Sequence, residues 1–241
     1  MSAHSKALPQ DGRETVADLR RRLGLFSFQQ DALTEEPTAA RCWGLGLDLR
    51  PGGIVEWLTA GPGAGAVACA MHLAMRPSFT AGVHVIVDSA REFHAPAFSS
   101  WGINPDRTLL VWPTTPKDAS WAIEQCLRCP GVSAVWAWID QRFPTHVHRR
   151  WQVAAEAGES VGIFFRPDAM RREPAWTDLR VLVTPLAGGR GETRRVRVET
   201  LYRRGGLGGT ARVLEIDHAE GVVRLVPELA NPTHKERSAR A

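Results

Sequence analysis

The sequence contains very little lysine, few cysteines and no apolar segment long enough to cross a membrane. Lys6, Lys117 and Lys235 are the only lysines among 30 basic residues in a chain of 241, so Arg supplies the remainder. Four cysteines are too few for a disulfide scaffold. A membrane span needs roughly 20 consecutive apolar residues, and a signal peptide needs an apolar core that the polar N-terminus lacks. We therefore expect a cytoplasmic protein without a membrane partner.

The spacings of metal sites and catalytic triads are also missing. Cys126 and Cys129 form a C-x-x-C pair, but no second Cys or His pair follows to complete a tetrahedral zinc site. His84 lies in an apolar run, and His146 and His148 have no nucleophile at motif spacing. The sequence predicts no metal site and no catalytic residues.

The length and the 44% hydrophobic content are sufficient for one substantial core. We expect one main domain over residues 41–228. A flexible arm, 1–40, precedes it and has the apolar spacing of a short helix at 14–24, and an unstructured tail at 229–241 follows it.

Apolar strand-like runs alternate with helical ones up to about residue 165. The expected strands are 54–58, 83–88, 108–112, 132–139 and 161–165, and the expected helices are 64–76, 93–102, 117–128 and 145–157. Wholly apolar strands separated by helices indicate a mainly parallel sheet with helices on both faces. Later runs with polar alternation, at 180–184, 194–202, 211–216 and 222–226, indicate antiparallel strands that extend the sheet at one edge. The expected fold is a three-layer α/β fold.

A glycine-rich loop, Gly61-Pro62-Gly63-Ala64-Gly65, stands between the first strand and a helix, which is the layout of a phosphate-binding P-loop. A working P-loop continues with Lys and then Ser or Thr, because the ammonium neutralises the terminal phosphates and the hydroxyl holds Mg²⁺. Ala66, Val67 and Ala68 follow the loop here. The favoured interpretation is a tight turn that lets the helix pack on the sheet, and weak anion binding by the loop amides stays open.

The succession of segments over residues 45–166 resembles the core of RecA. Residues 51–58 resemble the strand before RecA's ATP loop, and residues 86–110 resemble the segment from the strand that carries RecA's catalytic Glu to its next strand. Residues 118–140 resemble the helix and apolar strand around the Walker B acid. Among RecA-like proteins the sequence is most similar to the ImuA group, also called SulA-like. The shared motifs are the Gly-Pro-Gly-Ala loop without Lys, the segment Trp101–Leu110, the Trp-Ala-Ile-Glu sequence at Trp121–Glu124 and the turn Arg203-Arg204-Gly205-Gly206.

This resemblance implies an accessory protein of error-prone translesion DNA synthesis in the DNA damage (SOS) response. ImuA-type proteins are encoded with ImuB, an inactive Y-family polymerase homologue, and with an error-prone C-family polymerase, which are therefore the implied partners. Single-stranded DNA and RecA are further candidates. The implied location is the cytoplasm, at the nucleoid when the protein acts on DNA.

Departures from RecA argue against ATP hydrolysis. In the register that places Asp88 at the end of RecA's corresponding strand, the catalytic Glu position falls on Ala90. Glu92 is an alternative, although a solvated acid is commoner at such a position. Asp140 lies at or beside the Walker B position but lacks the loop hydroxyl that normally shares the metal. Asp88 and Asp140 are interpreted as vestigial acids, and we expect no cofactor, with weak ATP binding left open.

Arginines are concentrated near a Gly-rich turn in the C-terminal part of the chain. The candidate residues for binding DNA or a partner are Arg194, Arg195, Arg197, Arg203, Arg204 and Arg212. Arg195 and Arg197 project to one face of their strand, and Val196 and Val198 to the other. A solvated outer face and a surface that binds phosphates or an acidic partner both remain open.

Seven of the nine tryptophans, at positions 101, 112, 121, 136, 138, 151 and 176, fall mostly on expected strands or apolar helical faces. We expect core packing to account for the majority of them.

Three functions follow, in order of preference. The first is a non-catalytic RecA-like adaptor in translesion synthesis. The second is a DNA-dependent protein that binds or weakly hydrolyses ATP, with Asp88, Glu92 or Asp140 holding a metal. The third, suggested only by the SulA-like label, is an inhibitor of cell division.

Overall fold

The computed structural model describes residues 47, 50–61, 63–75, 79, 82–174, 176–187, 193–205 and 208–226. All of these belong to Ala39–Ala241, the second of the two units into which the chain divides. The expected helix at 14–24 and the expected tail at 229–241 lie outside the described residues.

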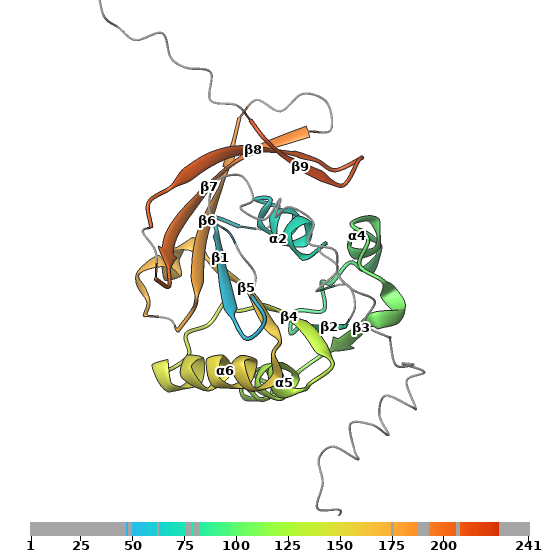
Figure 1. Cartoon of the computed structure of the whole chain (residues 1–241), viewed down its shortest axis with the longest axis vertical. Coiled ribbons are helices and arrows are strands. Elements are labelled where there is room, and N and C mark those ends of the chain that lie inside the picture. Colours follow the sequence, from blue (N-terminus) through green and yellow to red (C-terminus); the bar gives the residue numbers. More distant parts are fainter. Residues whose placement is uncertain are drawn as a thin grey trace, which may run out of the picture. The chain divides into compact units, whose positions relative to one another are not determined.

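A nine-stranded sheet forms the centre of this unit (Figure 1). Its order is β3-β2-β4-β5-β1-β6-β7-β8-β9; the strands from β3 to β6 in this order run parallel, and β7, β8 and β9 are added antiparallel. The strands are β1 (Ile54–Thr59), β2 (Val83–Val87), β3 (Thr108–Val111), β4 (Val132–Trp138), β5 (Val161–Pro167), β6 (Leu179–Leu186), β7 (Thr193–Arg203), β8 (Ala211–Asp217) and β9 (Val222–Leu225). The expected parallel sheet with an antiparallel extension at one edge is confirmed.

Helices cover both faces of the parallel part, which gives the three layers of a RecA-like core (Figure 1). α2 (Ala66–Ala74) and α4 (Ala95–Ser100) cover one face, and α5 (Pro116–Arg128) and α6 (Thr145–Gly158) the other. The described chain also contains two short 3₁₀ segments, η1 (Pro105–Arg107) and η2 (Asp168–Arg172). Because a strand between two helical layers has no solvent face, the parallel strands are apolar along their length.

The C-terminal strands form part of the same core. Val196 of β7 and Leu214 and Ile216 of β8 are fully buried together with the apolar residues of α2. Figure 1 shows β7 and β8 curving past α2. Strands β7 and β8 therefore extend the sheet so that it also packs against α2.

The expectation that most of the seven tryptophans are buried is wrong. Trp101, Trp136 and Trp151 are buried, whereas Trp112, Trp121, Trp138 and Trp176 are exposed. Trp112 and Trp138 lie at strand ends, Trp121 lies on the outer side of α5, and Trp176 precedes β6. Periodicity places a side chain on a face, but it does not show where the covering layer ends.

Within the described part of the chain, no helix is both long enough and apolar enough to span a membrane.

Candidate functional site

The glycine loop is a tight turn between β1 and α2. The Thr59 hydroxyl donates to the Gly61 carbonyl at 3.0 Å, and the Ala64 amide donates to the same oxygen at 3.4 Å. Gly65, with φ of +94°, directly precedes α2, and its carbonyl accepts a hydrogen bond from the Cys69 amide at 3.1 Å. A left-handed backbone at this position favours glycine over every other residue. Pro62 lies outside the described residues.

The inner face of β7 and β8 lies directly against this loop. A Cβ atom added to Gly65 would be 2.8 Å from Cγ1 of Val196 and 2.8 Å from Cδ1 of Ile216. Arg194, at the start of β7, donates a hydrogen bond from Nη1 to the Gly63 carbonyl. The loop glycines therefore allow close packing of the chain on itself, which agrees with the tight-turn interpretation.

The residues that follow the loop point into the core. Ala66 and Ala68 are buried, and Val67 packs against the same apolar cluster. A P-loop places its lysine and its Mg²⁺-binding hydroxyl at this point. The apolar side chains here supply neither a charge for phosphate nor a ligand for a metal.

The two acidic positions have different environments. Asp88 is buried, and its carboxylate accepts hydrogen bonds from the amides of Glu92 at 3.3 Å and Phe93 at 2.9 Å, so it caps the turn after β2. Asp140, after β4, is exposed. Among the described residues no group of three or more His, Cys, Asp or Glu side chains could hold a metal ion.

The six candidate arginines lie in separate places. Arg194 is at the glycine loop, and Arg212 lies across from Val198 on the inner side of the extension. Arg195 and Arg197 share the outer face, as expected, where they pair with Glu215 at 3.1 Å and Glu199 at 3.6 Å. These carboxylates offset the positive charge of the outer face and weaken its attraction for phosphate.

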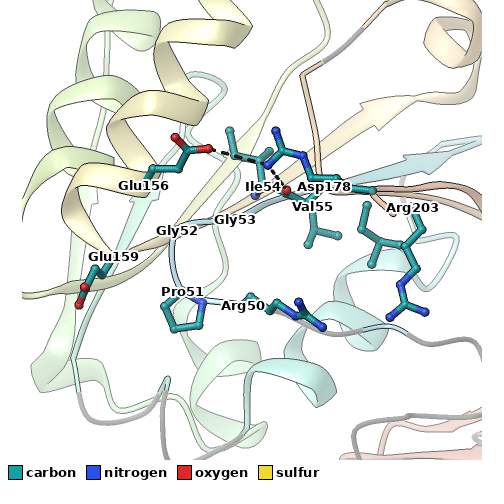
Figure 2. Close-up of a pocket in the computed structure, with 12 residues that line it drawn as sticks. Arg50, Pro51, Gly52, Gly53, Ile54, Val55, Glu156, Glu159, Asp178 and Arg203 are labelled. Carbon is teal, nitrogen blue, oxygen red and sulfur yellow. Dashed lines mark hydrogen bonds and ion pairs between the residues drawn. The ribbon is translucent and has the colours of Figure 1, made fainter. Parts of the chain in front are cut away.

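Arg203 and Arg204 line a cavity of about 620 Å³ at the amino end of β1, opposite the glycine loop (Figure 2). Arg204 pairs with Asp178 at 2.9 Å and lies 3.8 Å from Glu156, and Asp178 also accepts from the Ile54 amide at 2.9 Å. The Arg203 side chain has no ion pair with any described residue and lines the cavity together with Arg50. Arg204 therefore has a structural role, and Arg203 is the candidate for an external contact.

A buried charge network lies between the sheet and α6. Glu56 of β1 accepts from Arg166 at 2.6 Å and from Arg180, and Arg166 also donates to Glu173 at 2.9 Å. Glu56 and Arg166 are fully buried, and Nε of Arg166 and Nη2 of Arg180 have no hydrogen-bond partner among the described residues. Sequence reasoning missed this network, although a single Glu in an otherwise apolar central strand is a signal, since a buried carboxylate requires a partner.

His148 of α6 lies beside this network. Burial, together with the positive charge of Arg166, lowers the pKa of His148 to about 4. Its imidazole is therefore neutral at pH 7, so it adds no further charge to the buried ion pairs.

A second buried histidine, His84, bridges β2 and β4. Its Nδ1 accepts from the Trp136 indole at 3.1 Å, and its Nε2 lies 3.1 Å from the Phe79 carbonyl. This geometry requires the neutral form with the proton on Nε2, because the carbonyl can only accept. Burial lowers the pKa of His84, which agrees with that form. Both histidines therefore have structural environments.

Neither a scan of protein-family models nor a search of curated proteins finds a match to this chain.

Proposed function

We propose that this protein is a non-catalytic, RecA-like adaptor in damage-induced translesion DNA synthesis, with an inactive Y-family polymerase homologue of the ImuB type as its direct partner. The proposal is supported by the sequence resemblance to the ImuA group and by the RecA-like fold. An error-prone C-family polymerase, single-stranded DNA and RecA are the further partners that the resemblance implies.

One observation carries the non-catalytic part of the proposal. The loop that would hold a triphosphate is not followed by a lysine or a hydroxyl, Val196 and Ile216 of the same chain pack against it, and the Arg194 guanidinium is bound to the Gly63 carbonyl. Phosphate binding at such a loop depends on free amides and a nearby cation. The Asp88 carboxylate is already hydrogen-bonded to two amides, so it supports a turn.

Complex formation tests the adaptor role. The purified chain is mixed with the ImuB-type polymerase homologue from the same genome, and the mass of the complex is measured by size-exclusion chromatography with light scattering. We expect a stable complex that forms without ATP. Two separate elution peaks at micromolar concentrations of both proteins would refute the adaptor role.

Charge reversal of Arg203 tests the cavity as part of the contact. Arg203→Glu removes a cation that has no ion pair with a described residue, so the fold should be preserved, and Arg195→Gln on the outer face is the control. We expect weaker complex formation for Arg203→Glu alone. Equal retention of both variants would remove this cavity from the interface.

A further inference from the structure

Trp121 is exposed over 62% of its surface, more than any other large hydrophobic residue among those described. The other exposed tryptophans have ring partners: Arg91 lies 5.9 Å from the ring centroid of Trp112, Arg149 lies 4.7 Å from that of Trp176, and Trp138 stacks on Phe165 at 5.2 Å. Trp121 makes no hydrogen bond or ring contact with a described residue. Tryptophan is enriched among the residues that anchor protein–protein interfaces.

The helix that carries Trp121 is firmly fixed. Thr115 caps its start by accepting from the Asp118 amide at 3.1 Å, and Ala119, Ile123 and Leu127 pack on the sheet. The indole nitrogen of Trp151 on α6 donates to the Ser120 carbonyl at 3.1 Å, which sets the register of the two helices. Trp121 is therefore presented with little freedom, and little conformational entropy is lost on binding.

A second exposed apolar residue lies on α6, three residues after Arg150, and Trp121 lies three residues before Glu124 on α5, so each is one helical turn from its helix's member of the Arg150–Glu124 ion pair. Val153 of α6 is 41% exposed. Glu124 bridges the two helices by pairing with Arg128 of α5 at 3.0 Å and with Arg150 of α6. Figure 1 shows α5 and α6 side by side on one face of the sheet. Trp121, Val153 and the cations around them form what we call the α5–α6 patch.

The charge of the α5–α6 patch is positive. Lys117, Trp121 and Arg128 are four and seven residues apart and thus share one stripe of α5. Arg128 and Arg150 share a single carboxylate, Glu124, which is itself buried, and Lys117 adds a third cation. Asp118 is directed to the hydroxyls of Thr114 and Thr115, at 3.2 and 2.7 Å. An acidic ligand complements this surface.

We propose that the α5–α6 patch binds a segment of another polypeptide that places a large apolar side chain on Trp121 and Val153 and acidic side chains against Lys117, Arg128 and Arg150. A polypeptide fits better than a nucleic acid because Val153 offers an aliphatic contact in place of a stacking surface for a base. The inference stands on this geometry and does not depend on the proposed pathway.

Selection from a random peptide library displayed on phage tests the proposal without a known partner. The full chain is the bait, Trp121→Ser is used for counter-selection, and affinities of the selected peptides are measured by fluorescence anisotropy. Trp112→Ser is the matched control, because Trp112 is 54% exposed but lies at the end of β3. Thermal unfolding verifies that all variants are folded.

We expect peptides that carry a large apolar residue flanked by Asp or Glu. Trp121→Ser should lower the affinity of these peptides about tenfold or more, and Trp112→Ser should lower it less than about twofold. Lys117→Glu should also lower the affinity of these peptides and make that affinity depend less on salt concentration. The proposal is overturned if no peptide is enriched, if the selected peptides lack acidic residues, or if they bind Trp121→Ser as well as the wild type. It is equally overturned if oligo(dT) binds the wild type and loses its affinity in Trp121→Ser, because the patch would then bind nucleic acid.

Discussion

At the scale of single residues, the conformation and surroundings of Gly65 show that the glycine loop is built for packing. Its φ is +94°, and Val196 and Ile216 occupy the space where a Cβ would stand. Gly61, in the same loop, has no atom within 4 Å of the corresponding position and no positive φ. Packing therefore requires glycine at position 65 and not at position 61.

Gly65→Ala should therefore destabilise the protein by roughly 1–3 kcal/mol, because alanine must adopt a left-handed backbone next to two packed side chains. Gly61→Ala should change the free energy of unfolding by less than about 0.5 kcal/mol. Urea denaturation followed by circular dichroism measures both. Equal effects of the two substitutions would contradict the packing role of Gly65.

Glu56 compensates two arginines inside the core. Glu56→Ala should lower the free energy of unfolding by about 3–5 kcal/mol, since Arg166 and Arg180 would lose their shared buried carboxylate. Glu215→Ala breaks the partly exposed pair with Arg195 and should change stability by less than about 1 kcal/mol. Chemical denaturation measures the free energy of unfolding of both variants. A loss below about 1 kcal/mol for Glu56→Ala would show that the buried network contributes little net stability.

His148 should make stability depend on pH. Its pKa is about 4 in the folded protein and 6.5 in the unfolded chain, so between these values the unfolded state binds the extra proton. Stability is then complete above about pH 6.5 and falls as the pH drops toward 4, by up to about 3 kcal/mol. The observable is the loss of unfolding free energy between pH 7 and pH 4.5, which should be smaller for His148→Gln than for the wild type. Identical losses in the two proteins would exclude His148 as the cause.

At the scale of elements, the antiparallel extension has one buried and one exposed face. Ile216 of β8 is fully buried against α2 and the loop, whereas Val213 of the same strand is on the partly exposed outer face. Ile216→Ala should cost about 2–5 kcal/mol, and Val213→Ala clearly less. Thermal unfolding of the two variants checks this. Similar melting temperatures would mean that β8 packs only loosely on α2.

The elements themselves could be predicted from the sequence because each has a clear period. The strand at 132–139 and the helix at 117–128 differ from β4 and α5 by one residue at one end. The short 3₁₀ segments were missed, because three to five residues carry no periodic signal. The alternation of Arg195 and Arg197 with Val196 and Val198 likewise placed the two faces of β7 correctly.

The site was less predictable because it depends on contacts distant in sequence. The packing of Val196 and Ile216 on Gly65 joins segments more than a hundred residues apart, and no local pattern shows it. The arginines that cluster in sequence are dispersed, because β7 carries Arg194 to the loop end of the sheet and Arg203 to the opposite end. Core packing was expected for most of the seven tryptophans, but Trp121 is among the four that are exposed, on the outer side of its helix.

At the scale of the whole described unit, a RecA-like architecture is combined with a glycine loop that packs against C-terminal strands. The sheet, its strand order and its two helical layers are those of a RecA-like core. The C-terminal strands lie against the glycine loop, and Trp121, the most exposed large hydrophobic residue among those described, lies on the helical layer of the opposite face. Such a molecule is suited to holding binding surfaces at fixed positions.

The most direct test is equilibrium binding of ATP to the purified full chain, measured by isothermal titration calorimetry with and without Mg²⁺. The account predicts no saturable binding at ATP concentrations up to about 1 mM, because the loop lacks its cation and its hydroxyl and is packed against β7 and β8. A micromolar dissociation constant that requires Mg²⁺ would contradict it.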